Sequence, residues 1–358
     1  MGGQRLRHRC RRVSDRLELR SDNTAPAHPA VLDALARANE GAAGAYGDDA
    51  WTREAEDWFR DQFGGDSEAF LVWGGTGANV SALRAMTRPW EAVITSAHAH
   101  IHVDECGAPE LVAGVKLLDL PSPDAKLTVE QVREAAREGV GFEHHVQPRV
   151  VSLTQSTEYG TVYQPGELAA IAEVAHAHGL LVHVDGARIA NAAAALDRPL
   201  RAITRDVGVD VLSFGLTKNG AIGAEAVVFC TPSLAREFRY IRKQGMQLAS
   251  KMRFLAAQVV ALAAEDRWLA NARHANAMAR RLADGVRDVP GVALTQRVEA
   301  NAVFATMPTA LRTALEAHAR FHVWHEATGE VRWMTSWATE PAAVDAFIAA
   351  ARHAAGPG

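Results

Sequence analysis

Short apolar runs alternate with amphipathic segments along most of the chain, a pattern typical of βαβ units. Segment 166–179 is amphipathic, with apolar residues at helical spacing. Six runs have strand length and are rich in Val, Leu and Phe: 69–75, 91–96, 148–156, 180–187, 209–215 and 224–230. Their near-continuous hydrophobicity indicates strands buried on both faces, as in a mainly parallel sheet. The pattern therefore predicts an α/β fold.

The pattern changes after about residue 250, where a long helix is predicted over 251–286. Shorter strands are expected further on, near 292–297, 301–307 and 331–337. A chain of 358 residues also exceeds the size that one hydrophobic core usually supports. We expect a basic, disordered tail over 1–16, a large domain over 17–280 and a small C-terminal α+β domain over 281–358.

The composition is that of an ordinary globular protein, with 48% hydrophobic residues and a net charge of −4. Its basic residues form no long stripe with interleaved aromatics, which argues against a nucleic-acid partner. The three cysteines, Cys10, Cys106 and Cys230, include no CxxC pair, which argues against a disulfide framework and a zinc knuckle. There is neither a secretory signal nor an apolar run long enough to span a membrane, so we expect a cytoplasmic protein.

The run at 211–220, VLSFGLTKNG, begins as a buried strand and ends by presenting Lys218 in a loop. The ends of buried strands are where α/β proteins place their functional groups. An amine partly withdrawn from water loses some preference for its charged form and can form a Schiff base. A solvated surface lysine is the alternative for Lys218 taken alone.

Two further stretches carry residues that could act together with Lys218 at one site. Asp185 ends the strand at 180–187, where it either caps the next helix or faces a ring nitrogen and keeps that nitrogen protonated. The stretch FLVWGGTGAN reads as a strand, a glycine turn and a helix, and Gly75 and Thr76 there can hold a phosphate at the helix N-terminus. Asp185 and Lys218 lie 33 residues apart, one βαβ step, so they are expected at the same edge of the sheet. Together the three anchors fit pyridoxal 5'-phosphate.

The chain resembles the low-specificity L-threonine aldolases, which are pyridoxal-phosphate lyases with the aspartate-aminotransferase fold, also called fold type I. The stretches that carry the resemblance are RSDN (20–23), AYGDD (45–49), GGTGAN (74–79), AHIHVDECGAPE (99–110), PRVVSLTQSTEYGTVY (148–163), HVDGARIANA (183–192), SFGLTKNGA (213–221), QLASKMRFLAAQ (247–258) and VRWMTSW (331–337). The resemblance implies a seven-stranded type of sheet, Lys218 as the cofactor lysine and Asp185 at the ring nitrogen. It also implies a homotetramer with active sites at the dimer interface.

The same resemblance assigns further site residues. His100 corresponds to the histidine that stacks over the cofactor ring, and His144 to the histidine near the substrate hydroxyl, with His145 as a competing choice. The residues that fall where the family binds the substrate carboxylate are Ser21, Arg188 and Arg332. Lys251 lies near a basic position that can reach a phosphate across a subunit boundary.

The run HAHIH also has a rival interpretation. In an extended strand, His98, His100 and His102 would point to one face and could ligate zinc. The stacking role available to His100 outweighs this interpretation, so no metal is expected.

The predicted activity is retro-aldol cleavage of L-threonine or L-allo-threonine to glycine and acetaldehyde. The alternatives are another pyridoxal-phosphate lyase or transaldolase on the same scaffold, and a non-catalytic cofactor-binding regulator.

Overall fold

A mixed, mostly parallel sheet of seven strands is the centre of the molecule. The computed structural model describes residues 16–356, so Cys10 and nearly all of the predicted tail lie outside the described residues. In spatial order the strands are β2 (Glu68–Val72), β8 (Glu225–Phe229), β7 (Val211–Gly215), β6 (Leu181–Gly186), β5 (Gln147–Thr154), β3 (Glu91–Ser96) and β4 (Lys116–Leu120). Six of these strands run in the same direction, and β8 runs in the opposite direction. The predicted α/β class is confirmed.

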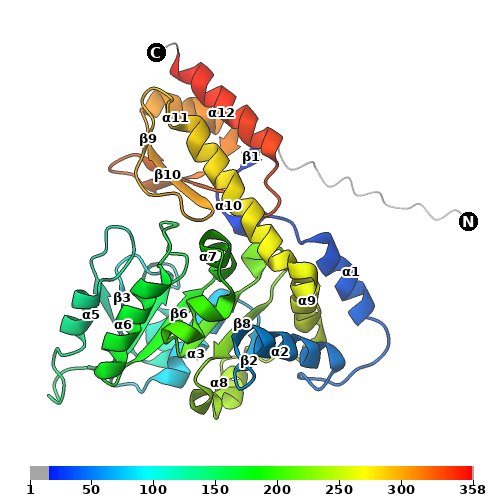
Figure 1. Ribbon diagram of the computed structural model, residues 1–358, viewed down its shortest axis with the longest axis vertical. Helices are drawn as coiled ribbons and strands as arrows, with labels where there is room; N and C mark the ends of the chain where they lie inside the picture. The colour runs from blue at the N-terminus through cyan, green and yellow to red at the C-terminus, as the bar shows by residue number, and fades with distance from the viewer. Residues whose placement is uncertain (1–15, 357–358) are drawn as a thin grey trace, which may run out of the picture.

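Two helical layers cover the sheet (Figure 1). One face packs against α3 (Gly75–Met86) and α8 (Phe238–Gln244). The other face packs against α1 (Pro29–Ala38), α2 (Ala50–Phe63), α5 (Val129–Ala135), α6 (Pro165–Ala177), α7 (Ile189–Leu196) and α9 (Arg253–Ala263). Successive strand residues divide between the two cores, as in β6, where Val182 and Val184 face the second layer. Burial on both faces explains why the strands read as continuous apolar runs.

The six predicted strands are present, whereas β4 was not among them. Its sequence, KLLDL, carries two charges, Lys116 and Asp119, within five residues, and the strand lies at the edge of the sheet. An edge strand is buried less completely than a central one, so its hydrophobic signal is weaker.

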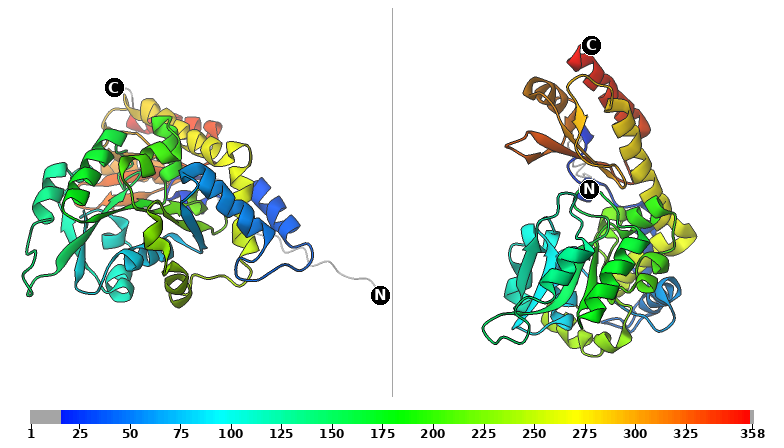
Figure 2. Two further views of the ribbon diagram at one scale, coloured as in Figure 1. Left: turned by 60° about the horizontal axis from the view of Figure 1, so that its bottom comes forward. Right: turned by 60° about the vertical axis from the view of Figure 1, so that its left-hand side comes forward.

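The single helix predicted over 251–286 is instead two helices, α9 and α10 (Arg267–Val286). Glu265 and Asp266 between them both adopt positive φ angles, 56° and 52°. These left-handed residues break the helical hydrogen-bond pattern and turn the chain. The long helix α10 then connects the two parts of the molecule (Figures 1 and 2).

A smaller unit stands beside the large sheet (Figure 2). Its four-stranded antiparallel sheet has the order β12 (His322–His325), β13 (Glu330–Met334), β10 (Ala302–Thr306) and β9 (Ala293–Leu294). The helices α11 (Thr309–Glu316) and α12 (Pro341–Ala355) pack with α10 around a separate core. The predicted boundary at residue 280 falls inside α10. The strand β1 (Leu17–Glu18) pairs with β11 (Ala319–Arg320), so the start of the described chain contacts this smaller unit rather than the large sheet.

Gly215, the last residue of β7, is required by the close approach of β6. A Cβ built on Gly215 would lie 2.5 Å from the Ala187 carbonyl oxygen and 2.7 Å from its Cα. Backbone atoms cannot move aside as a flexible side chain does, so the two strand ends would separate. This glycine therefore sets the spacing between the segments that carry Asp185 and Lys218.

We predict that Gly215→Ala lowers the free energy of unfolding by roughly 1–3 kcal/mol, because overpacking displaces neighbouring backbone. Urea denaturation monitored by circular dichroism measures the change. Gly65→Ala is the matched control, since a Cβ there meets nothing within 4 Å. Equal stabilities for the two variants would contradict the packing argument.

Candidate active site

Asp185 and Lys218 lie at the same edge of the sheet, on neighbouring parallel strands. Asp185 pairs in register with Thr154 of β5 and Ser213 of β7. Lys218 follows β7 by three residues, in the 3-10 turn Thr217–Asn219. The βαβ step predicted from their spacing is therefore the β6–α7–β7 unit, which brings the two residues to the carboxyl ends of adjacent strands.

The carboxylate of Asp185 is buried and held at both oxygens. Oδ1 accepts a hydrogen bond from the backbone N–H of Ala187 at 2.9 Å, and Oδ2 accepts one from Asn79 Nδ2 at 2.7 Å. Asp185 itself is only 4% exposed. The backbone bond closes the turn before α7, whose N-cap Arg188 has no side-chain cap hydrogen bond, so Asp185 does not cap that helix. The Asn79 contact comes from α3.

His100 begins the short helix α4 (His100–Val103), so the extended strand assumed for a zinc site at residues 98–102 is wrong. Its Nδ1 lies 2.9 Å from Glu105 Oε1, and its backbone N–H donates to Glu158 Oε1 at 2.8 Å. The Glu105 hydrogen bond raises the pKa of His100 above its usual value, with Asp185 adding to this effect and burial and Lys218 opposing it. The ring remains 40% exposed.

The start of α3 supplies backbone donors close to this edge. Gly74 caps the helix without a side-chain hydrogen bond, and Gly75 and Thr76 form its first turn. Gly77 is tightly packed, since a Cβ there would lie 2.4 Å from Gln247. The unoccupied N–H groups and the positive end of the helix dipole suit an anion.

Arg188 and Asp22 form a bidentate ion pair between the large sheet and the N-terminal segment. Arg188 Nε lies 2.7 Å from Asp22 Oδ2, and its Nη2 lies 2.9 Å from Oδ1. Asn301 of the smaller unit donates to the same carboxylate at 3.0 Å. Although burial opposes ionisation, Arg188 lowers the pKa of Asp22 overall, with a smaller effect from Lys218. Asp22 is the partner that fixes Arg188 at the site.

Arg332 comes from β13 and lies close to Arg188. Its guanidinium stacks on Trp324, 4.5 Å from the ring centroid, and its Nη2 donates to the carbonyl of Arg20 at 3.0 Å. Burial, together with the positive charge of Arg188, lowers the pKa of Arg332 to about 10. Within residues 16–356, Arg332 has no carboxylate partner, so it is a half-buried cation, with a buried and unpaired Nε, that an anionic ligand would stabilise.

The structure thus gathers seven of the predicted site residues around one edge of the sheet: Gly75, Thr76, His100, Asp185, Arg188, Lys218 and Arg332. Ser21 is close, because it follows Arg20, which contacts Arg332. The Ser21 hydroxyl caps a 3-10 turn by accepting from the Asn23 N–H at 3.2 Å. Lys251 is exposed on the segment before α9.

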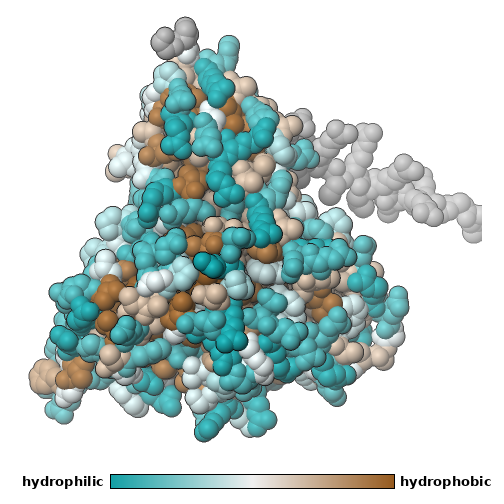
Figure 3. Space-filling view, viewed as in Figure 1, coloured by the Kyte–Doolittle hydropathy of each residue, from teal (hydrophilic) through white to brown (hydrophobic). Residues whose placement is uncertain are grey.

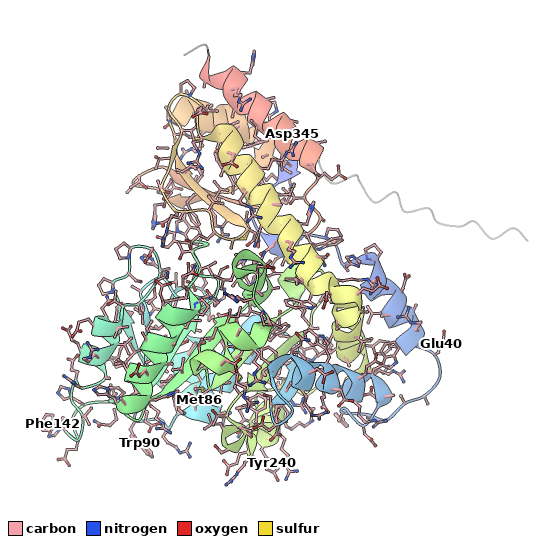
Figure 4. The ribbon with its side chains drawn as sticks, viewed as in Figure 1. Glu40, Met86, Trp90, Phe142, Tyr240 and Asp345 are labelled. Carbon is pink, nitrogen blue, oxygen red and sulfur yellow. The ribbon has the colours of Figure 1, made fainter. Side chains whose placement is uncertain are left out.

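His144 is the exception, because the structure does not bring it together with the other predicted site residues of its own chain. It lies in the loop before β5, at the opposite edge of the sheet from Asp185, with its side chain 72% exposed. Eight residues of β5 separate that loop from the site, roughly 25 Å. Phe142, in the same loop, marks its position far from the smaller unit in Figure 4. His145 shares this loop.

Several residues that contribute to the site were missed in the sequence. Asn79, Glu105 and Asp22 lie within the stretches that resemble the family, but their buried contacts join segments far apart in the chain. Trp324 gives no local signal, because its contact with Arg332 depends on the register of β12 and β13. For Glu105, the separation of five residues from His100 in HIHVDE is the one clue available in the sequence.

The residues fit pyridoxal 5'-phosphate, on observations independent of the resemblance. Lys218 Nζ forms no hydrogen bond or ion pair with any residue of 16–356, so the amine is available for a covalent bond. Asp185 offers a buried carboxylate on the adjacent strand, and the first turn of α3 offers donors for a phosphate. Arg332, half-buried and without a carboxylate partner within residues 16–356, supplies an anion site for an amino-acid substrate.

The fold and this residue set define an enzyme of the fold-type I class, whose members carry a lysine and an aspartate at the carboxyl edge of such a sheet. A family model described as beta-eliminating lyase matches residues 18–310. The chain belongs to this lyase family and, by its 46% and 44% identity to two bacterial relatives of that name, to the low-specificity L-threonine aldolases within it.

Individual relatives agree with this placement. The chain is 46% identical over 322 residues to a low specificity L-threonine aldolase of Pseudomonas aeruginosa, covering 89% of this chain and 92% of the relative. A relative of the same name from a Pseudomonas species is 44% identical and covers 90% and 94%. A solved threonine aldolase of Leishmania major superposes with a TM-score of 0.90 at 29% identity, covering 95% of this chain and all of that one.

Glu158 is a further residue that was missed in the sequence, and its carboxyl group is unusual. Oε1 accepts from the His100 N–H and from the Thr154 hydroxyl at 2.8 Å each, whereas Oε2 is shielded from solvent and has no partner within residues 16–356. Burial raises the pKa of Glu158 from 4.5 to about 7. The folded protein therefore retains a proton that the unfolded chain releases as the pH rises from about 4.5 to 7, so this group lowers stability across that window.

We predict that Glu158→Gln removes this pH dependence, because the amide keeps the Oε1 contacts but does not ionise. Relative to the wild type, the cofactor-free variant should gain about 1–3 kcal/mol in free energy of unfolding between pH 4.5 and pH 8. Urea titrations at fixed protein concentration measure the difference. Glu143→Gln serves as control, since that side chain is 89% exposed. Parallel pH curves for wild type and Glu158→Gln would exclude a neutral Glu158.

Proposed function

We propose that the protein binds pyridoxal 5'-phosphate and cleaves L-threonine, L-allo-threonine and related β-hydroxy-α-amino acids to glycine and an aldehyde, acetaldehyde for threonine. The observation that carries the proposal is the convergence of Lys218, Asp185 and the Arg188–Arg332 pair at one sheet edge. The relatives named above as threonine aldolases support the same choice of substrate.

Each cofactor-binding residue has a distinct task in this proposal. Lys218 would hold the cofactor through its amine, which has no protein partner within residues 16–356. Gly75 and Thr76 would bind the phosphate, and His100 would lie against the ring. Asp185 keeps the ring nitrogen protonated, which its hydrogen bonds from Asn79 and Ala187 favour by stabilising the ionised carboxylate. When bound, the cofactor supplies a conjugated ring that accepts the electron pair of the breaking Cα–Cβ bond.

Binding of the substrate carboxylate determines which bond is broken. Arg332 has free guanidinium hydrogens, whereas Arg188 already donates two bonds to Asp22. We therefore assign Arg332 the larger share of the carboxylate binding, with Arg188 and Ser21 as secondary contacts. Holding the carboxylate would restrict rotation of the substrate about its Cα–N bond and so would select which bond to Cα is broken.

The proton of the β-hydroxyl must be removed as this bond breaks. His100 binds Glu105 through Nδ1, so Nε2 is left without a protein partner in residues 16–356. This nitrogen, directly or through a water molecule, is the proton acceptor that the described chain offers. His144 could serve only if it came from another subunit, given its position within its own chain.

The surface next to the phosphate-binding turn supports a homo-oligomer, and we propose the homotetramer of the family. Trp73, Leu111 and Met246 are 52%, 83% and 85% exposed. A cavity of about 320 Å³ between α3, α8 and residues 108–112 opens nearby. Exposed apolar side chains in such number are typical of an interface. Figure 3 shows the face seen in Figure 1, which is mostly hydrophilic with scattered apolar residues.

We also propose a cytoplasmic location without nucleic-acid or membrane partners. Cys106 and Cys230 are free thiols, consistent with a reducing compartment. Within residues 16–356, every helix is too short or too polar to cross a membrane.

Incubation of the cofactor-loaded protein with L-threonine and with L-allo-threonine tests the proposed activity. Acetaldehyde and glycine in equal amounts are expected. Ammonia and 2-oxobutanoate without acetaldehyde would show β-elimination instead. Bound cofactor without any product would favour a non-catalytic regulator.

We predict that borohydride reduction, which makes the lysine–cofactor linkage permanent, labels Lys218 in the wild type and leaves Lys218→Ala unlabelled. The reason is the position of this amine, at the end of β7 and free of protein partners within residues 16–356. Peptide mapping by mass spectrometry locates the label. Label on Lys243 or Lys251 would refute the assignment.

We predict that Arg332→Ala reduces kcat/KM for L-threonine by at least about 30-fold while leaving folding and the Lys218 linkage intact. Loss of a buried, forked contact with a carboxylate costs roughly 2–5 kcal/mol. Arg332→Lys should recover only part of the activity, because an ammonium group cannot make the forked contact. Steady-state kinetics measure both variants, with Arg287→Ala, an exposed arginine at the C-cap of α10, as control. Near-normal kcat/KM for Arg332→Ala would leave carboxylate binding to Arg188 and Ser21.

A further inference from the structure

Two buried side chains, Glu105 and Asn79, connect His100 to Asp185. Glu105 Oε1 lies 2.9 Å from His100 Nδ1 and accepts a bond from Asn79 Nδ2 at 2.8 Å. The same Asn79 nitrogen lies 2.7 Å from Asp185 Oδ2. The Glu105 side chain is 0% exposed and Asn79 is 2% exposed. A continuous chain of contacts therefore links the two residues without passing through solvent.

The orientation of the Asn79 amide follows from its partners. An ionised carboxylate only accepts hydrogen bonds, and Asn79 contacts two of them, so the amide must present its NH₂ group to both. An NH₂ group has two hydrogens, one for each carboxylate. Asn79 thereby separates two buried negative groups that would otherwise repel each other strongly at low dielectric constant. A leucine of similar size could not do this.

Glu105 determines which nitrogen of His100 is free. With Oε1 facing Nδ1, that nitrogen carries a hydrogen, and the neutral ring presents an unprotonated Nε2. The charged groups around His100 come from several elements: Glu105 after α4, Asp185 on β6, Lys218 after β7, and Glu158, which binds its backbone. Among these groups only Glu105 contacts the ring itself within residues 16–356.

We propose that Glu105 and Asn79 act as a positioning pair for the two groups that handle protons in the reaction. Glu105 fixes the tautomer and orientation of His100, and Asn79 fixes Asp185 while holding Glu105 in place. Neither residue touches the substrate in this arrangement. The inference rests on the proposed function, because that function assigns His100 and Asp185 their tasks.

Glu105→Gln tests the first half of the pair. The amide oxygen still accepts a hydrogen bond, but the negative charge is lost, so the pKa of His100 should fall. NMR titration of cofactor-free protein carrying ¹⁵N-histidine measures this directly, with His100→Asn identifying the resonance. In kinetics, kcat should fall about 10-fold or more with little change in KM, and the limb of the pH profile that belongs to His100 should move to lower pH. Glu105→Asp keeps the charge and should restore part of the pKa.

Asn79→Ala tests the second half. Without the amide, Asp185 keeps only the Ala187 N–H, and a less stabilised carboxylate takes a larger share of the ring proton. The resonance of ¹⁵N-labelled pyridoxal phosphate bound to the variant should therefore shift toward that of an unprotonated pyridine. Glu110→Gln, an exposed carboxylate on the next segment, is the control for both experiments.

The two readouts separate this inference from the proposed function. An unchanged His100 pKa in Glu105→Gln, or an unchanged ring ¹⁵N shift in Asn79→Ala, would overturn the corresponding half of the pair. Should Glu105→Gln not fold, Glu105→Asp provides the same titration with the charge retained and the hydrogen bond lengthened. Failure of the wild type to form acetaldehyde would refute the proposed activity, while both NMR measurements would still decide the roles of Glu105 and Asn79.

Discussion

The parallel pairing of β6 with β7 is the constraint on which the site depends. Because the strands run in the same direction, their carboxyl ends meet at one edge, and Asp185 and Lys218 follow at corresponding positions. The crossover through α7 makes this possible, and the absence of a side chain at Gly215 lets the two strand ends approach each other. The groups contributed by α3, α4 and the smaller unit are arranged around that fixed pair.

Burial then determines the chemistry of the charged groups. Three carboxyl-bearing residues, Glu105, Glu158 and Asp185, lie within one network around His100, and two guanidinium groups lie beside it. Where a partner is present, as for Asp22 with Arg188, the charge is retained. Where an oppositely charged partner is absent, burial shifts the pKa, downward for Arg332 and upward for Glu158. The uncompensated cation suits an anionic substrate, and the neutral acid limits the negative charge near the ring site.

The sequence was most informative where function and local pattern coincide. Buried strands and the residues at their ends could be predicted from hydrophobic runs, and so Lys218 and Asp185 were found by position alone. The edge strand β4 and the break at Glu265 were missed, because low burial weakens one signal and left-handed residues other than glycine give no signal at all. Contacts such as Asn79 with Glu105 depend on how distant segments pack. For His144 the difficulty was different: the family resemblance assigned it to the site, whereas the structure places it in a loop far from the site residues of its own chain.

The pairing of β1 with β11 makes the beginning of the described chain part of the smaller unit, although residues 21 and 22 lie at the active site. Arg20 and Asp22 are bound by Arg332 and Asn301, both from that unit, while Arg188 binds Asp22 from the large sheet. A rotation of one unit against the other would therefore pull directly on this N-terminal segment. Because β1 links this segment to the smaller unit, a change in the relative orientation of the two units would also change the geometry of the carboxylate-binding residues.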